Sequence, residues 1–277
     1  MPELPEVELV ARALDKLTTG RRILAAELLR PGLAPDTPPR KFGRLLKGAR
    51  IERVGRRGKH LLIETDGSHV LIVHLRMTGR FLYLPIEAPL PKFAHAVFHL
   101  DGNRRLVFCD QRHFGMMKIV ERSRLHETKE LSALAPEPFS DSFTVDYLHS
   151  ALRRSRRTLK ETLLDQKRVT GLGNIYAAEA MFLARVNPFI IASEVSRRRV
   201  PRLHRAILDT FTDALRLGST LNVDPENIDG SYNGGGYTTR WRVYDREGEP
   251  CHSCGAMIRR TAHAGRSTYF CPRCQRR

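Results

Sequence analysis

Four cysteines near the C-terminus constrain this chain more than any other feature. Cys251 and Cys254 form one Cys-x2-Cys pair, Cys271 and Cys274 form a second, and sixteen residues separate the pairs. Each pair can present two thiolates to one tetrahedral ion, and a spacer of this length suits a β-hairpin that closes the site. The spacing therefore predicts one bound Zn2+ rather than a redox pair. Because a metal bound by four sulfurs has no open coordination position, this Zn2+ is expected to be structural. The remaining cysteine, Cys109, falls in a predicted strand and is expected to be a small buried hydrophobic residue.

The charge of the chain points to a polyanionic partner. Forty-seven Lys and Arg against thirty Asp and Glu give a net charge of +17. Such a balance favours nucleic acid as the first candidate partner and an anionic membrane surface as the second. The segment 251–277 adds six arginines and no acid, which favours contact with phosphate over a solvated basic tail.

The N-terminus does not resemble a targeting segment. No apolar run approaches the ~20 residues that a membrane span needs. The first eight residues hold Glu3, Glu6 and Glu8, where a signal peptide would be basic. We therefore expect a soluble, cytoplasmic protein without a membrane partner. We also expect it to be a monomer.

The acidic N-terminus also opens a predicted helix. From Pro5 onward, apolar residues recur at the spacing of one helix face, namely at Val7, Val10, Ala11, Leu14 and Leu17. Proline suits a first helical position, and carboxylates complement the positive end of the helix dipole. On this stretch alone, ordinary helix-start residues are the simpler interpretation of Glu3 and Glu6.

Strand patterns follow the helix. Residues 60–65 and 69–75 are rich in aliphatic and β-branched side chains and flank Asp66-Gly67, a strong hairpin signal. A second pair, 96–100 and 105–109, flanks a turn at 101–104. The first half of the chain therefore reads as a β-rich domain with a helix at its start.

The second half reads as helical. The polar, proline-containing stretch 132–142 breaks the periodicity and marks a domain boundary. Helical spacing then runs from Thr144 to Leu217, with breaks at 170–173, near Asn187-Pro188 and at Pro201. The glycine-rich stretch 218–239 has little periodicity, and a loop of that length is usually functional or disordered.

A tight turn in the helical half is a candidate phosphate site. Gly171 and Gly173 bracket a turn into a helix that starts near Asn174, between the basic stretches 152–168 and 196–205. Backbone N–H groups at a helix start can hold a phosphate, and the asparagine adds a side-chain donor. An ordinary capped turn is the alternative, but the basic flanks favour phosphate.

Seven motifs, in order along the whole chain, resemble the formamidopyrimidine-DNA glycosylase family. They are MPELPEVE (1–8), RRGKHLL (56–62), HLRMTG (74–79), QRHFG (111–115), LLDQKRVTGLGNIYAAEA (163–180), YDREGEPC (244–251) and GRSTYFCPRCQ (265–275). The resemblance implies an α+β fold, with an N-terminal β-sandwich flanked by helices and a helical helix–two-turn–helix domain that ends in a zinc-finger β-hairpin. The implied domains are a catalytic sandwich at 1–131, a linker at 132–142, a helical DNA-binding domain at 143–240 with a lesion-covering loop at 218–239, and a four-cysteine zinc finger at 241–277.

The resemblance also implies a bifunctional DNA glycosylase and abasic-site lyase of base excision repair, acting on damaged double-stranded DNA. After removal of Met1, the secondary amine of Pro2 would attack C1′ of the sugar and form an iminium, which is covalent catalysis of the Schiff-base kind. Glu3 would protonate the sugar ring oxygen, and Glu6 would stabilise the cation. Lys59 would contact phosphate and act as an acid, and Arg266 would grip the lesion phosphates and assist δ-elimination.

Further DNA-binding residues carry over from the resemblance by position. His74 and Asn174 match phosphate ligands; His95, Arg112 and the more loosely matched Arg156 match DNA-binding positions; Met77, Arg112 and Phe114 match side chains inserted into the duplex. Each could otherwise be an ordinary surface charge, strand histidine or core residue.

Departures from the family pattern bear on the choice of lesion. Leu9 replaces the usual threonine after ELPEVE, His113 interrupts an arginine pair, and the 218–239 stretch runs through an unusual Tyr-Asn-Gly-Gly-Gly-Tyr. The default substrates are 8-oxoguanine and formamidopyrimidines. The alternatives are an endonuclease VIII-like glycosylase for oxidised pyrimidines or hydantoins, a non-catalytic zinc protein that binds damaged DNA, and an RNA-binding zinc protein.

Overall fold

A computed structural model describes residues 1–222, 228, 231–232, 234–276. The chain forms two compact units, one made of residues 1–132 and 220–235 and the other of residues 133–219 and 236–277. The stretch 220–235 thus groups with the N-terminal unit, and the zinc hairpin groups with the helices. The functional domain boundaries expected from the sequence stay a prediction. Among the helices that the structure describes, none combines the length and apolarity needed to cross a membrane.

The N-terminal unit is built on two four-stranded antiparallel sheets. One contains, in spatial order, β1 (Ile23–Leu28), β6 (Ala94–Leu100), β7 (Arg104–Asp110) and β5 (Gly79–Pro85). The other contains β2 (Ile51–Arg57), β3 (His60–Thr65), β4 (His69–His74) and β8 (Met116–Glu121). Phe81 and Phe108 of the first sheet and Leu61 and Val73 of the second belong to one buried apolar cluster, as in a sandwich.

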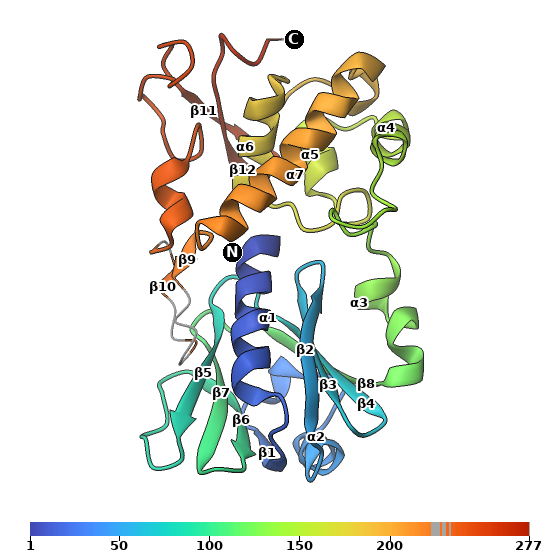
Figure 1. The fold of residues 1–277 in the computed structure, drawn as a ribbon, viewed down its shortest axis with the longest axis vertical. Helices are drawn as coiled ribbons and strands as arrows, with labels where there is room; N and C mark the ends of the chain where they lie inside the picture. The colour runs from blue at the N-terminus through green and yellow to red at the C-terminus, as the bar shows by residue number, and fades with distance from the viewer. Residues whose placement is uncertain (223–227, 229–230, 233, 277) are drawn as a thin grey trace. The chain divides into compact units, whose positions relative to one another are not determined.

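Helices close the open sides of this core. Helix α1 (Leu4–Thr18) packs against β2 (Figure 1) through its buried face. Helix α2 (Pro39–Leu46) packs against β1 and buries Phe42. The shorter elements are η1 (Pro31–Leu33), η2 (Arg122–Glu127), α3 (Lys129–Ser132), β9 (Leu221–Asn222) and β10 (Ser231–Tyr232).

The second unit is helical and carries the zinc hairpin. Its helices are α4 (Val145–Arg153), α5 (Leu159–Leu164), α6 (Asn174–Ala184) and α7 (Val200–Arg216), with short turns η3 (Ala192–Glu194), η4 (Arg197–Arg199) and η5 (Gly236–Arg240). The hairpin is formed by β11 (Arg259–His263) and β12 (Arg266–Phe270). Helix α6 packs against both α7 and β12 and so joins the helices to the hairpin.

Two details differ from the sequence expectations. The strands β1, β2, β5 and β8 and helix α2 were not anticipated, because short half-buried segments carry weak periodicity. Pro201 lies in the first turn of α7 and opens that helix instead of breaking one. The predicted loop 218–239 is described only in part, because residues 223–227, 229–230 and 233 lie outside the described residues.

Candidate active site

The residues at the start of α1 are buried together. Pro2 is buried, and the side chains of Glu3 and Glu6 belong to residues only 2% and 1% exposed. Glu3 is the N-cap of α1, and the two glutamates form a capping box in which the Glu3 amide donates to Glu6 Oε2 at 2.8 Å. The helix-start interpretation of these acids is therefore correct as far as local structure goes.

Glu6 has a second set of partners far away in the sequence. Its Oε1 accepts hydrogen bonds from the backbone amide of Thr220 at 3.1 Å and from the Thr220 hydroxyl at 2.8 Å. A helix cap alone would not require burial of two carboxylates or a contact across 214 residues of sequence. The arrangement buries two carboxylates one and four residues after Pro2 in the chain, and buried negative charge of this kind can stabilise a nearby cation.

A second group of predicted site residues lies at and near the turn between β2 and β3. Gly58, at φ 58°, and Lys59 form the two-residue turn between Arg57 and His60, as expected for a hairpin with glycine at the first turn position. Lys59 is 5% exposed, and its charge helps to lower the pKa of His74 on β4. A buried lysine held on a tight hairpin is well placed to act on a substrate at a fixed position.

His74 is held as a neutral hydrogen-bond donor. Its Nδ1 accepts the backbone amide of Arg76 at 3.0 Å, which leaves the proton on Nε2. Burial, followed by the charges of His60, Arg76 and Lys59, lowers the pKa of His74 to about 2. Burial likewise lowers the pKa of His60, whose ring meets that of His74 edge-on at 4.7 Å, to about 4.

Two loops of the N-terminal unit present the predicted inserted side chains. Met77 lies between β4 and β5, and Arg112 and Phe114 lie between β7 and β8. Asp110 joins these loops, because its carboxylate accepts the Thr78 hydroxyl and the Arg112 and Gly115 amides.

All three side chains point away from the core. Met77 is 38% exposed and Phe114 is 53% exposed, although both are residue types that usually pack inside. Arg112 is exposed and lies 5.0 Å from the Phe114 ring centroid. An apolar side chain and a cation held on a rigid loop can enter a duplex and replace an extruded base.

His95 is buried on β6, at 4% exposure, beside the same loop. Its Nε2 lies 3.0 Å from Nδ1 of His113, a residue that the sequence marked only as a departure from the family pattern. His95 therefore contacts the loop between β7 and β8 directly, through its hydrogen bond to His113.

In the second unit, Asn174 and Arg266 are linked through the backbone of Ser267. Asn174 begins α6 and donates its side-chain amide to the Ser267 carbonyl at 3.1 Å. Arg266 is exposed and begins β12, directly after a turn in which Ala264 and Gly265 are both left-handed, as a type I′ turn requires.

Lys160 on α5 fixes the same strand. It is 1% exposed and donates to the Ser267 carbonyl and to the Thr268 hydroxyl, both at 2.7 Å. The two acceptors directly follow Arg266, so Lys160 determines where this arginine is held. Nothing in the sequence pattern separated Lys160 from the other basic residues of 152–168.

The four cysteines meet the geometry of a zinc site. Their sulfurs all lie within 4.8 Å of one another, with Cys251 Sγ 3.9 Å from Cys274 Sγ and Cys254 Sγ 3.5 Å from Cys271 Sγ. A tetrahedron with Zn–S bonds of about 2.3 Å has edges of roughly 3.8 Å. Burial raises the pKa of the Cys274 thiol, and a bound cation would offset this effect and favour the thiolate. Cys109 lies elsewhere, buried on β7 as expected.

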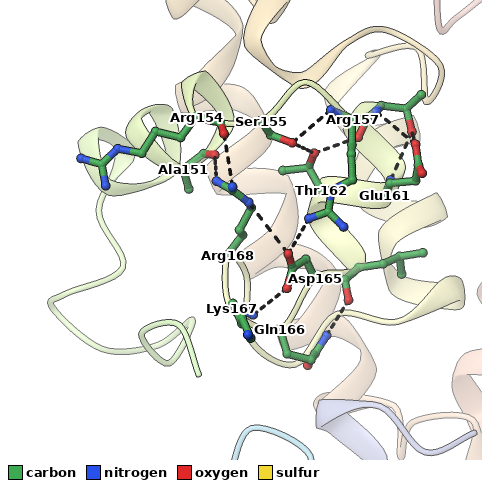
Figure 2. A network of polar contacts seen from close by, with 12 residues as sticks. Ala151, Arg154, Ser155, Arg157, Glu161, Thr162, Asp165, Gln166, Lys167 and Arg168 are labelled. Atoms are coloured by element: carbon green, nitrogen blue, oxygen red, sulfur yellow. Dashed lines mark hydrogen bonds and ion pairs between the residues drawn. The ribbon is translucent and has the colours of Figure 1, made fainter. Parts of the chain in front are cut away.

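Polar contacts made by Arg157 and Arg168 hold the basic stretch 152–168 (Figure 2). Arg168 donates to the carbonyls of Ala151 and Arg154, and Arg157 pairs with Asp165. Arg156 is exposed, as are Arg153 and Arg154. The network fixes the backbone of this segment and leaves Arg156 available at the surface.

Sequence reasoning therefore missed partners rather than the candidates themselves. Thr220 donates to Glu6, and Asp110 accepts the amide of Arg112. Lys160 donates to Ser267 and Thr268, the two residues that follow Arg266. Glu179 is a further structural acid: it is fully buried on α6 and accepts the amides of Arg242, Val243 and Tyr244. A threonine or a buried charge of this kind has no local sequence signal.

Family models match most of the chain, and they match in the order that the fold suggests. Residues 1–117 match the formamidopyrimidine-DNA glycosylase N-terminal domain, residues 134–224 match the formamidopyrimidine-DNA glycosylase H2TH domain, and residues 248–277 match a zinc finger found in FPG and IleRS. The chain belongs to the formamidopyrimidine-DNA glycosylase family. The resemblance drawn from the seven motifs is confirmed, and so are the α+β fold class and the structural zinc site.

Curated relatives and solved structures agree with this assignment. A formamidopyrimidine-DNA glycosylase of Desulforamulus reducens is 39% identical over 277 residues, covering 100% of this chain and 99% of the relative. One of Symbiobacterium thermophilum is 42% identical, covering 99% of this chain and 89% of the relative. The Lactococcus lactis Fpg in complex with DNA containing an abasic site has a TM-score of 0.91 and 32% identity, covering 99% of this chain and 100% of that one.

Proposed function

We propose that this family member is a bifunctional DNA glycosylase and abasic-site lyase of base excision repair that removes oxidised purines from double-stranded DNA. The observation that carries the proposal is the buried start of α1, where Pro2 is followed by two buried glutamates whose carboxylates are held by hydrogen bonds. Formamidopyrimidine-DNA glycosylases at about 40% identity over the full length support the same activity.

The reaction begins at Pro2 once Met1, which is exposed, has been removed. An α-amine with a typical pKa of about 7.7–8.0 is far more often neutral at pH 7 than a lysine amine. The lone pair of the Pro2 nitrogen forms a bond to C1′ while the bond from C1′ to the base breaks. The proton displaced from the Pro2 nitrogen is taken up by the departing base. Glu3 then gives a proton to O4′, the C1′–O4′ bond opens, and the cationic iminium is stabilised by Glu6.

Strand cleavage follows from the iminium. Because the amine is secondary, the iminium cannot lose its charge by deprotonation and remains an electron sink. Loss of a C2′ proton breaks the C3′–O bond and frees the 3′-phosphate, with Lys59 as the acid and phosphate contact. A second elimination breaks the C5′–O bond, and Arg266 holds the phosphate that leaves.

DNA binding is divided among the remaining residues. Met77, Arg112 and Phe114 enter the duplex and fill the space of the extruded base. His74, His95, Arg156 and Asn174 hold the phosphate backbone. His74 contributes as a neutral donor because its pKa is far below the working pH.

The lesion preference follows the family name: 8-oxoguanine and formamidopyrimidines are the proposed substrates. The endonuclease VIII-like alternative stays open because the atypical 218–239 stretch would cover the extruded base, and a Lactococcus lactis Fpg is described with DNA that contains an oxidised pyrimidine. We propose that the protein acts in the cytoplasm as a monomer.

Borohydride trapping on a panel of lesion duplexes tests the proposal. Reduction of the iminium should link protein to DNA covalently with 8-oxoguanine and formamidopyrimidine duplexes, and blocking the N-terminal amine should abolish the link. Trapping only on oxidised pyrimidines would favour the endonuclease VIII-like activity. Tight binding without any adduct would favour the non-catalytic DNA-binding protein.

A further inference from the structure

His95 and His113 share a direct hydrogen bond between their imidazole rings. His95 Nε2 and His113 Nδ1 are 3.0 Å apart, and the rings are nearly parallel, with an interplanar angle of 18° and centroids 4.9 Å apart. His95 is buried, whereas His113 is exposed between Arg112 and Phe114. A titratable pair therefore connects the sheet to the surface loop proposed to meet DNA.

The loop holds His113 in one backbone conformation. His113 has a φ of 60°, an uncommon left-handed conformation for a residue other than glycine. Its amide donates to the Asp110 carbonyl at 3.3 Å, and the Asp110 carboxylate accepts the amides of Arg112 and Gly115. The imidazole is thus directed by the loop backbone as well as by His95.

The hydrogen bond between the two rings (the bridge) limits how many protons the histidine pair can hold. The neutral pair has two N–H protons, of which one lies between the rings and the other lies on an outer nitrogen. One further proton can occupy the remaining bare outer nitrogen without disturbing the bridge. A second added proton would have to occupy one of the two nitrogens that share the hydrogen bond, which would break that bond. The intact pair therefore gains at most one positive charge.

The charges around the pair oppose this proton in the free protein. The charged groups that act on His95 are Asp110 at the end of β7 and Arg30 after β1. Arg112 precedes His113 in the chain, and Lys92 lies over the ring of Phe93, which contacts the ring of His113. Asp110 favours a charged His95 imidazole, whereas Arg30 disfavours it. Burial, and then His113, lowers the pKa of His95 below its ordinary value.

We propose that His95 and His113 form a proton-sharing site for a DNA phosphate, in which His113 Nε2 donates to a phosphate oxygen and the pair takes up one proton on binding. The proposal rests on the proposed function, because it requires the loop from Asp110 to Gly115 to lie against DNA. A phosphate adds negative charge to that of Asp110 beside the pair, so binding favours the protonated form. His113 stands where the family pattern has a permanently charged arginine, so the charge of this phosphate contact depends on pH.

The test is the pH dependence of DNA affinity. The ligand is a duplex with a tetrahydrofuran analogue of an abasic site, and its Kd is measured by fluorescence anisotropy from pH 5.5 to 8.5 at constant ionic strength. Uptake of one proton makes binding up to about tenfold tighter for each unit that the pH falls. The same uptake appears in titration calorimetry as a binding enthalpy that changes with the ionisation enthalpy of the buffer.

Three variants show whether the pair is the origin of this dependence. His113→Gln should bind more weakly at pH 6 and lose most of the slope, whereas His113→Arg should bind tightly with a flat profile. His126→Gln, which changes an exposed histidine of η2, should keep the wild-type slope. Thermal unfolding of each variant establishes that it is folded.

The outcomes separate the two proposals. A wild-type slope that persists in His113→Gln, or a flat wild-type profile with tight binding, would overturn the proton-sharing site and leave the glycosylase proposal intact. Failure of the wild-type protein to bind the duplex at any pH would contradict the proposed function itself.

Discussion

At the scale of single residues, Glu3 and Glu6 combine structural and chemical roles. Both belong to the capping box of α1, but only Glu6 also accepts two hydrogen bonds from Thr220. Substitutions that keep the size of each side chain and remove its charge should therefore have different effects. The two glutamates provide a matched pair at one helix end.

Glu3→Gln should lower the rate of base excision by about 10²–10⁴-fold, because an amide cannot deliver a proton to the sugar. Its carbonyl oxygen can still cap the helix, so thermal stability should change little. Glu6→Gln should lose activity and also about 1–3 kcal/mol of stability, because its NH2 group would face hydrogen-bond donors. Single-turnover kinetics and urea unfolding check both effects, and equal stability losses would contradict this division of roles.

At the scale of elements, the β3–β4 hairpin carries the half-buried His60 and the buried His74, whose pKa values both lie below the unfolded value of 6.5. The pKa of His60 is about 4 and that of His74 about 2, in both cases mainly because of burial. Above pH 6.5 neither the folded nor the unfolded protein binds a proton at these two histidines, and their contribution to folding stability is fully present. Below pH 6.5 the unfolded chain takes up protons that the folded hairpin does not, so stability falls as the pH falls.

Each histidine should contribute a slope of about 1.4 kcal/mol per pH unit between its two pKa values. His60→Gln should remove one of these contributions between pH 6 and pH 4.5, and the exposed His126→Gln should remove none. Urea unfolding at a series of pH values measures the slopes. An unchanged slope in His60→Gln would show that this ring is already protonated in the folded protein.

The zinc hairpin makes a prediction about Lys160, which positions Arg266 without contacting substrate in our account. Lys160→Met should weaken binding to the tetrahydrofuran duplex to the same extent as Arg266→Ala, because Ser267 and Thr268 lose their shared donor. Lys160→Arg should restore part of the affinity. Zinc content should stay at one per chain in both variants, and loss of zinc would instead indicate that the hairpin itself had unfolded.

The same elements show what the sequence could predict. The zinc ligands, the hairpin at residues 60–65 and 69–74 and the first helix follow from spacing and periodicity, which are local properties. The contact from Glu6 to Thr220, the buried Lys160 and the bridge from His95 to His113 depend on tertiary structure. Nor could periodicity alone show that Met77 and Phe114 are exposed, since both read as core residues.

At the scale of the whole molecule, the net charge of +17 should make DNA affinity strongly dependent on salt. Removal of one phosphate contact by Arg266→Ala should lower the slope of log Kd against log salt concentration by about one. Arg124→Ala, which removes an exposed arginine of η2 already paired with Glu127, should leave the slope unchanged. Equal slopes for wild type and Arg266→Ala would mean that this arginine faces solvent in the complex.

The central claim is that the nitrogen of Pro2 becomes bonded to C1′ of the damaged nucleotide. Mass spectrometry of the borohydride-reduced adduct, after digestion of protein and DNA, locates that bond directly. We predict a sugar remnant on an N-terminal peptide that begins at Pro2 and lacks Met1. A remnant on Lys59 or another lysine, or Met1 retained on fully active protein, would contradict the account.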